Sequence, residues 1–167
     1  METKPKLKLT LSPIDKILDG MSTVLLIVML VLAVYVTFNA PSVIPVHFNE
    51  LGHPDKFGKR FTIFILPLIG TVIYAVFNQI VKFPEIYNHL TKITGENARQ
   101  QYTITTRIIR FLKLSMLLIF IVIIFFTYLT SIGKSKGLGA WFLPFVLGLT
   151  LIPTMLLIGH SVKGEKT

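Results

Sequence analysis

The segment IPVHFNELGHPDKFGKR, residues 44–60, separates two long apolar runs and so decides how the chain divides. Three of its residues, Gly52, Pro54 and Gly58, are turn formers, and we expect the two glycines to serve the backbone conformations that they permit. Residues 43–49 alternate, with Val46 and Phe48 facing one way and the polar residues the other, which predicts a short extended piece before the turn. An ordered loop between two helices is the expectation.

The runs on both sides of this loop, and two more downstream, are long enough to cross a membrane. The chain of 167 residues is 52% hydrophobic and only 15% charged, with a mean hydropathy of +0.69. About 20 apolar residues cross a bilayer core, and four runs without acidic or basic residues occupy positions 20–49, 61–81, 114–133 and 137–162. The first run is too long for the apolar part of a cleaved signal peptide. We predict an all-α integral membrane bundle forming one domain, with four transmembrane helices at about 21–39, 61–81, 108–130 and 140–160.

The distribution of basic residues predicts the orientation. The net charge is +9, but no basic run with interleaved aromatic residues forms a separate domain, so nucleic-acid binding is not predicted. Twelve of the 17 basic residues lie before the first span, between the second and third spans, or after the fourth: Lys4, Lys6, Lys8, Lys16, Lys82, Lys92, Arg99, Arg107, Arg110, Lys113, Lys163 and Lys166. The other five are Lys56, Lys59, Arg60, Lys134 and Lys136. Because loops rich in lysine and arginine stay inside, both termini are predicted to be cytoplasmic and the loop at 44–60 extracytoplasmic.

Several local signals predict where helices begin, bend and end. Ser12 followed by Pro13 is typical of a helix start, and Pro41 is expected to end the first span by disfavouring helix at the residue before it. Pro67 predicts a kink in the second span. Tyr74 and Thr71 are expected to hydrogen-bond across the bundle, or else to line a polar cavity.

The third helix is predicted to begin near Thr94 in the cytoplasm and to run unbroken into the bilayer. Its first turns carry a polar stripe at helical spacing: Arg99, Thr103, Thr106, Arg110 and Lys113. We interpret this stripe as a solvated or headgroup-facing surface, with a docking face for a cytoplasmic protein as the alternative. The opposite, apolar face would then hold Tyr102, Ile108, Ile109 and Leu112.

The chemistry of the loop allows two interpretations. It holds five side chains able to coordinate a metal: His47, Asn49, Glu50, His53 and Asp55. In the structural interpretation Asn49 and Asp55 hydrogen-bond the turn, and Lys59 and Arg60 lie at the membrane boundary. In the alternative, His47, His53 and Asp55 would hold a metal with Glu50 as a base, but no ligand pair is fixed on one helix or strand. No cysteine is present. We therefore predict neither a metal, nor another cofactor, nor an enzyme.

Two patches carry a resemblance to a known family. The first is the pattern IPxHFN, GxPD and FGK, formed by Ile44, Pro45, His47, Phe48, Asn49, Gly52, Pro54, Asp55, Phe57, Gly58 and Lys59. The second is TGENARQQY at 94–102, with Glu96, Asn97, Arg99 and Tyr102. Both resemble a bacterial membrane-protein family of undefined biochemistry whose named members are SdpI-type immunity proteins, which are longer and carry additional helices.

That resemblance implies a multi-pass protein of the bacterial inner membrane, acting in binding and protection or as a signal relay. Its partners would be the lipid bilayer, a secreted toxin or antimicrobial peptide outside, and a cytoplasmic protein inside. The alternatives are a structural or accessory subunit of a larger membrane complex and a metal-dependent membrane enzyme. The sequence leaves the oligomeric state open.

Overall fold

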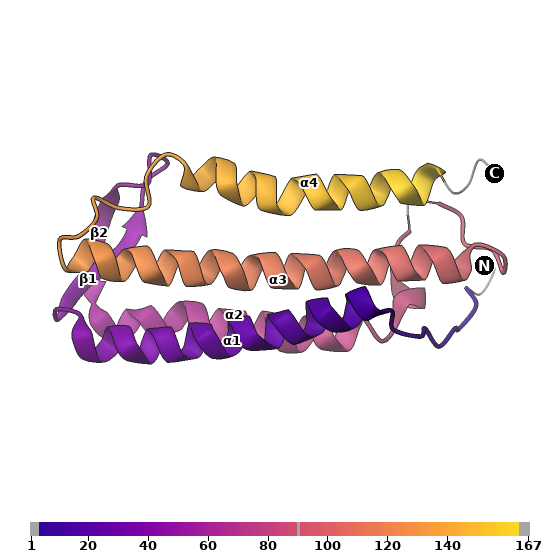
Figure 1. Cartoon of the computed structure of the whole chain (residues 1–167), viewed down its shortest axis with the longest axis horizontal. Helices are drawn as coiled ribbons and strands as arrows, with labels where there is room; N and C mark the ends of the chain where they lie inside the picture. The colour runs from indigo at the N-terminus through magenta and orange to yellow at the C-terminus, as the bar shows by residue number, and fades with distance from the viewer. Residues whose placement is uncertain (1–3, 90, 164–167) are drawn as a thin grey trace.

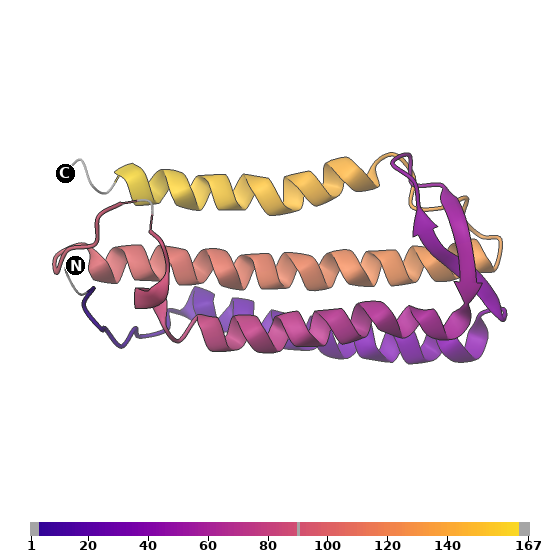
Figure 2. The same cartoon turned by 180° about the vertical axis from the view of Figure 1, so that it is seen from behind.

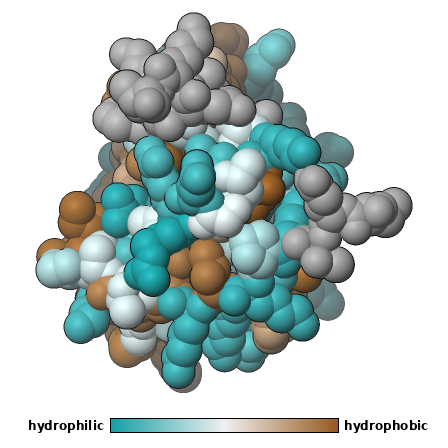
Figure 3. All heavy atoms as spheres, turned by 90° about the vertical axis from the view of Figure 1, so that its right-hand side faces the viewer, coloured by the Kyte–Doolittle hydropathy of each residue, from teal (hydrophilic) through white to brown (hydrophobic). Residues whose placement is uncertain are grey.

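Four long helices run up and down, and a small β-hairpin covers one end of them (Figures 1 and 2). The computed structural model describes residues 4–89 and 91–163, so Lys166 lies outside it. The elements are α1 (Pro13–Asn39), β1 (Val43–Phe48), β2 (Pro54–Lys59), the 3-10 helix η1 (Arg60–Phe64), α2 (Ile65–Ile80), the 3-10 helix η2 (Pro84–Ile86), α3 (Ala98–Ser131) and α4 (Phe142–Lys163). We call the two ends of the bundle the hairpin end and the terminal end, since both described chain ends lie at the latter, whose surface carries many hydrophilic side chains (Figure 3).

Within residues 4–89 and 91–163, four helical segments are long and apolar enough to cross a membrane, as predicted: Pro13–Asn39, Arg60–Ile80, Ala98–Ser131 and Phe142–Gly159. Length and composition thus indicate a multi-pass membrane protein. Many large apolar side chains are exposed on the helices, Leu68 and Met155 among them. Lipid would cover these side chains.

α1 begins and ends at the predicted signals. Ser12 is the N-cap, and Asp15 completes a capping box, because its carboxylate accepts from the Ser12 backbone N–H at 3.0 Å. At the other end Ala40, the residue before Pro41, is extended with ψ 155°, so the helix stops at Asn39. Arg60 lies against this end: its backbone N–H donates to Ser42 O at 3.0 Å.

α2 differs from the expectation of a kink in mid-span. Pro67 is the third residue of α2 and follows η1, so it lies at the change from 3-10 to α geometry, where few α-helical hydrogen bonds precede it. Gly70 serves close packing: a Cβ there would lie 2.7 Å from the Met29 methyl carbon. Tyr74 does hydrogen-bond across the bundle, to Thr23 at 2.7 Å, whereas Thr71 donates within its own helix to Pro67 O at 2.7 Å.

α3 is the central helix, and α1, α2 and α4 all pack against it (Figures 1 and 2). It runs unbroken for 34 residues, as predicted. Its start is one turn later than Thr94, although Thr94 and Asn97 exchange hydrogen bonds between side chain and backbone at 2.9 and 3.3 Å. The apolar core joins α1, β1, η1 and α3: Met29, Val36, Ala40, Ile44, Ile63, Leu117 and Ile124.

The expected extended piece is β1, and it has a partner that the sequence did not predict. β2 pairs with it antiparallel, so the fold is mostly helical with one hairpin rather than all-α. The register skips Val46 in β1 and Asp55 in β2. Such bulges re-aim the side chains next to them, and the simple alternation predicted for residues 43–49 is therefore wrong beyond Pro45.

The tip of the hairpin docks on the loop between α3 and α4. The carbonyl of Gly52 accepts from Leu138 N at 2.7 Å, and Gly52 has φ +75°, as its predicted backbone role requires. A Cβ on Gly52 would lie 2.4 Å from Gly139 N, and one on Gly137 would lie 2.1 Å from Gly52 O. Gly58 is different: its φ is not positive, and its lack of a side chain makes room for Val46, which a Cβ would meet at 2.9 Å.

Candidate binding site at the hairpin end

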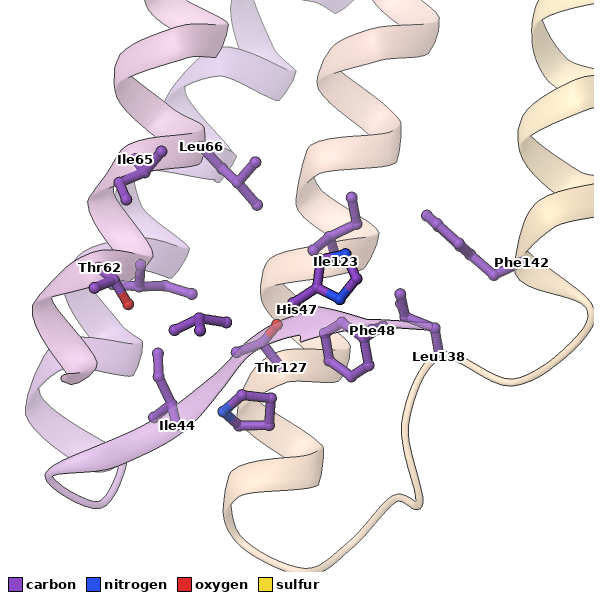
Figure 4. Close-up of a pocket in the computed structure, with 13 residues that line it drawn as sticks. Ile44, His47, Phe48, Thr62, Ile65, Leu66, Ile123, Thr127, Leu138 and Phe142 are labelled. Carbon is purple, nitrogen blue, oxygen red and sulfur yellow. The ribbon is translucent and has the colours of Figure 1, made fainter. Parts of the chain in front are cut away.

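A mainly apolar cavity of about 350 Å³ lies directly under the hairpin (Figure 4). β1 supplies one wall, η1 and α2 a second, and α3 with the start of α4 and the loop before it the rest. The lining residues are Ile44, Pro45, Val46, His47, Phe48, Thr62, Ile63, Ile65, Leu66, Ile123, Thr127, Leu138 and Phe142. Val46, His47 and Phe48 are consecutive, and all three can reach the cavity because the strand is bulged there.

His47 is the principal polar side chain of this lining. Its Nδ1 lies 2.6 Å from the Asp55 carboxylate, across the two bulges. Both side chains remain accessible, at 57% and 38% exposure. A contact this exposed adds little to stability, and both side chains are available to a ligand at the hairpin surface. Asp55 thus contacts a histidine, whereas the structural interpretation expected it to hydrogen-bond the turn; for Asp55 that interpretation is wrong.

Asn49 holds the turn, as that interpretation predicted. Its side-chain oxygen accepts from the backbone N–H groups of Leu51 and His53, each at 3.0 Å. The Asn49 N–H donates in turn to His53 O at 2.9 Å. Because these bonds use the side chain of Asn49 and only the backbone of His53, the amide is structural and the imidazole is dispensable for the turn.

The signature residues therefore separate into three groups. Pro45 and Gly52 are buried; His47, Phe48 and Asn49 occupy the cavity wall and the turn; and Pro54, Asp55, Phe57, Gly58 and Lys59 form β2, with Phe57 60% exposed. Within the residues that the structure describes, no group of three or more His, Cys, Asp or Glu side chains is arranged to hold a metal. His47 and Asp55 are the pair that the fold brings together.

The second signature patch divides in the same way at the terminal end. Glu96 and Arg99 are exposed, Asn97 is the N-cap residue of α3 but makes no side-chain capping bond, and Tyr102 is completely buried. The Tyr102 hydroxyl donates to Pro5 O at 3.1 Å, so it fastens the N-terminal segment to α3.

The predicted solvated stripe on α3 is wrong for three of its five members. Thr106, Arg110 and Lys113 are 2%, 4% and 1% exposed and face the bundle. The cause is a pair of acidic residues on α1 whose role the sequence analysis did not identify. Lys113 Nζ donates to Asp19 Oδ1 at 2.8 Å, and Arg110 Nε donates to Asp19 Oδ2 at 3.0 Å.

This buried ionic cluster is completed by neighbours on α1, α2 and α3. Arg107 Nε donates to Asp15 at 3.1 Å, and Lys113 Nζ also donates to Asn78 Oδ1 at 2.7 Å. Next to hydrocarbon, charged side chains usually face the interior of a bundle and pair with one another. The three buried members of the polar stripe therefore mark the face of α3 that packs inside the bundle, and not a solvated surface.

Two titratable groups cap the terminal end outside the helices. Burial raises the pKa of Tyr87 to about 12, and its hydroxyl donates to Ile80 O. Burial also lowers the pKa of His89, whose ring lies 5.2 Å from that of Tyr102 and 3.0 Å from Pro84 O through Nε2. The His89 imidazole is therefore part of the packing at this end.

These features define a class: a polytopic membrane protein with a four-helix bundle, a hairpin cap over an apolar cavity and a buried ionic cluster at the other end. Residues 24–71 match the family model of a domain of unknown function, DUF1648. That stretch covers most of α1, the hairpin, η1 and the first part of α2. No curated protein and no solved structure gives a significant match to the chain.

The matched region supplies the hairpin and most of the cavity wall. Ile123, Thr127, Leu138 and Phe142 complete the wall from α3, the loop after it and α4, which lie outside the match. The cavity therefore belongs to the whole bundle.

Proposed function

We propose that this protein binds an envelope-acting peptide or protein at its hairpin end and protects the cell from it. The observation that carries the proposal is the apolar cavity under the hairpin, next to the exposed His47–Asp55 pair. Ligand sites are typically concave and apolar with a few polar groups that set orientation. The resemblance of the hairpin sequence to SdpI-type immunity proteins supports the same class of role.

The proposal requires the hairpin to face outward. In the sequence, twelve basic residues lie before the first span, between the second and third spans or after the fourth, against five in the other loops, and this excess supports cytoplasmic termini and an extracytoplasmic hairpin in the inner membrane. Lys56 and Lys59 then flank the hairpin outside. Impermeant labelling of single cysteines placed at Ser42 and Gly95 tests this orientation: intact cells should label at 42 and not at 95.

An apolar segment of the toxin would enter the cavity while a polar group meets His47 and Asp55. Leu66 lines the cavity from α2, and Leu68 lies two residues further on the same helix at 68% exposure. Leu66→Trp should fill the cavity, whereas Leu68→Trp places the same indole on the outer surface of the bundle. This pair separates occupation of the cavity from any general effect of a bulky residue in α2.

The experiment expresses wild type, Leu66→Trp and Leu68→Trp at equal membrane levels in sensitive cells exposed to toxins of related bacteria. We expect protection from wild type and Leu68→Trp, and none from Leu66→Trp. A double variant, His47→Ala with Asp55→Ala, should weaken protection while leaving the fold intact, because both side chains are exposed. Equal protection by both Trp variants would exclude the cavity as the recognition site, and no protection by wild type would favour an accessory subunit instead.

A further inference from the structure

A second cavity, of about 510 Å³, lies at the terminal end beside the ionic cluster. It lies between the N-terminal segment, the first turns of α1, the end of α2 and α3. Its lining residues are Leu7, Lys8, Leu9, Leu11, Asp19, Asn78, Val81, Lys82, Pro84 and Arg110. The lining thus combines three basic side chains, Lys8, Lys82 and Arg110, with several aliphatic ones and one acidic residue, Asp19.

Arg110 is the fixed charged group of this cavity. Its side chain is only 5% exposed, and Asp19 holds it through Nε at 3.0 Å. Among the described residues the two terminal nitrogens of Arg110 make no hydrogen bond, and Arg110 is one of the residues that line the cavity. A guanidinium with two free nitrogens matches the oxygens of a phosphate.

The local charge favours an anion. Asp19 is shared by Arg110 and Lys113, so the three groups together carry one excess positive charge. Lys8 and Lys82 add two more cations at the cavity, and both are exposed. Lys82 Nζ donates to Gln79 Oε1, three residues earlier, at 2.9 Å. Because Lys82 is exposed, it can exchange this contact for one with a phosphate.

We propose that this cavity binds the headgroup of an anionic phospholipid, with Arg110, Lys8 and Lys82 around the phosphate and the leucines of the N-terminal segment along the glycerol and first acyl carbons. The aliphatic lining favours an amphiphile over a free phosphate ion. The cavity also lies where α2 ends, at the boundary of the apolar span, which is the depth of lipid phosphates. Basic pockets between transmembrane helices recognise headgroups in this way.

Purified full-length protein in non-ionic detergent, titrated with phosphatidylglycerol at low salt, tests the proposal by native mass spectrometry. The double variant Lys8→Gln, Lys82→Gln should weaken phosphatidylglycerol binding roughly 25-fold, since each cation near an anionic headgroup contributes about fivefold. The matched control Lys56→Gln, Lys59→Gln removes the same charge from exposed lysines at the hairpin end and should bind as wild type does. Arg110→Lys keeps the charge beside Asp19 but loses the fork, and should weaken binding about tenfold.

Inorganic phosphate, added as a competitor, separates the two sources of the headgroup chemistry. Displacement of the lipid only at concentrations far above that of the lipid itself would support a phospholipid site. Displacement by phosphate at equal concentration would overturn the lipid and leave a soluble phosphate compound as the ligand. Equal losses in the two lysine double variants, or wild-type affinity in Arg110→Lys, would overturn the site itself.

Discussion

Replacing Gly52 by alanine tests how the hairpin is attached to the bundle. Gly52 has φ +75°, and Gly133, in the loop after α3, has φ +74°. A Cβ on Gly133 meets nothing within 4 Å, whereas one on Gly52 meets the Gly139 backbone at 2.4, 2.6 and 2.8 Å. Gly133→Ala is therefore a control that carries the same backbone strain without the clash.

The magnitudes follow from these two differences. The left-handed conformation costs an alanine roughly 1 to 2 kcal/mol at either position. At Gly52 the clash also separates the tip from the loop and breaks the bond from Leu138 N, a residue only 4% exposed. A buried donor left without a partner costs about 1 to 3 kcal/mol. Gly52→Ala should thus lower the free energy of unfolding by about 2 kcal/mol more than Gly133→Ala.

Equilibrium unfolding in mixed micelles, followed by the fluorescence of Trp141 close to the docked loop, measures both variants. Equal losses of stability in the two variants would show that the tip does not dock on the loop at 137–139. A larger loss of stability in Gly133→Ala than in Gly52→Ala would also refute the assumption that the positive φ costs an alanine the same at both positions.

Three further predictions concern the cluster, the turn and the terminal end. Asp19→Asn leaves two buried cations without their acidic partner and should lower the free energy of unfolding in micelles by about 3 to 5 kcal/mol. Lys113→Met leaves Asp19 paired with Arg110, so its loss in the same assay should lie at the lower end of that range. Asn49→Ala should cost about 1 to 2 kcal/mol by removing the acceptor of two N–H groups, while His53→Ala should be neutral in the same assay. The pKa of His89 is lower in the folded protein than its value of about 6.5 in the unfolded chain, so the unfolded chain binds more protons near and below that pH. The contribution of His89 to stability is therefore full above about pH 6.5 and falls as the pH drops below it. A His89 ring resonance in the NMR spectrum of the folded protein that titrates at the ordinary pKa would contradict this.

The helices could be predicted from the sequence because apolar length alone sets them. The ends of α1 could also be predicted from the sequence, since Ser12 and Pro41 act through local backbone chemistry. β2 was not predicted, because PDKFGK has no alternation of apolar and polar residues and begins with a proline. Its pairing depends on contacts with β1 and not on its own composition.

The polar stripe of α3 was predicted at the right residues and assigned to the wrong surroundings. Spacing places Arg110 and Lys113 on one face but does not say what lies opposite. In a soluble protein that face would meet water; next to lipid, charges turn inward to Asp19 and Asn78. The sequence did contain a signal that was overlooked: two acidic residues on α1, Asp15 and Asp19, lie one helical turn apart. They pair with basic residues on α3, a helix that is far away in the sequence but adjacent in the fold.

The hydrogen bonds that attach α4 to the rest of the bundle restrict how this helix can move. Among the helices it packs on α3, and none of its 18-residue apolar window is buried. At the hairpin end the loop leading into it is bound to Gly52, and at the terminal end Gln101 on α3 donates to Ser161 O at 3.1 Å. A third bond lies between these two, where Ser115 on α3 donates to Leu149 O at 3.4 Å. Sliding of α4 along its axis would break all three attachments, so a displacement of the hairpin tip along the bundle acts on α4 directly through Gly52.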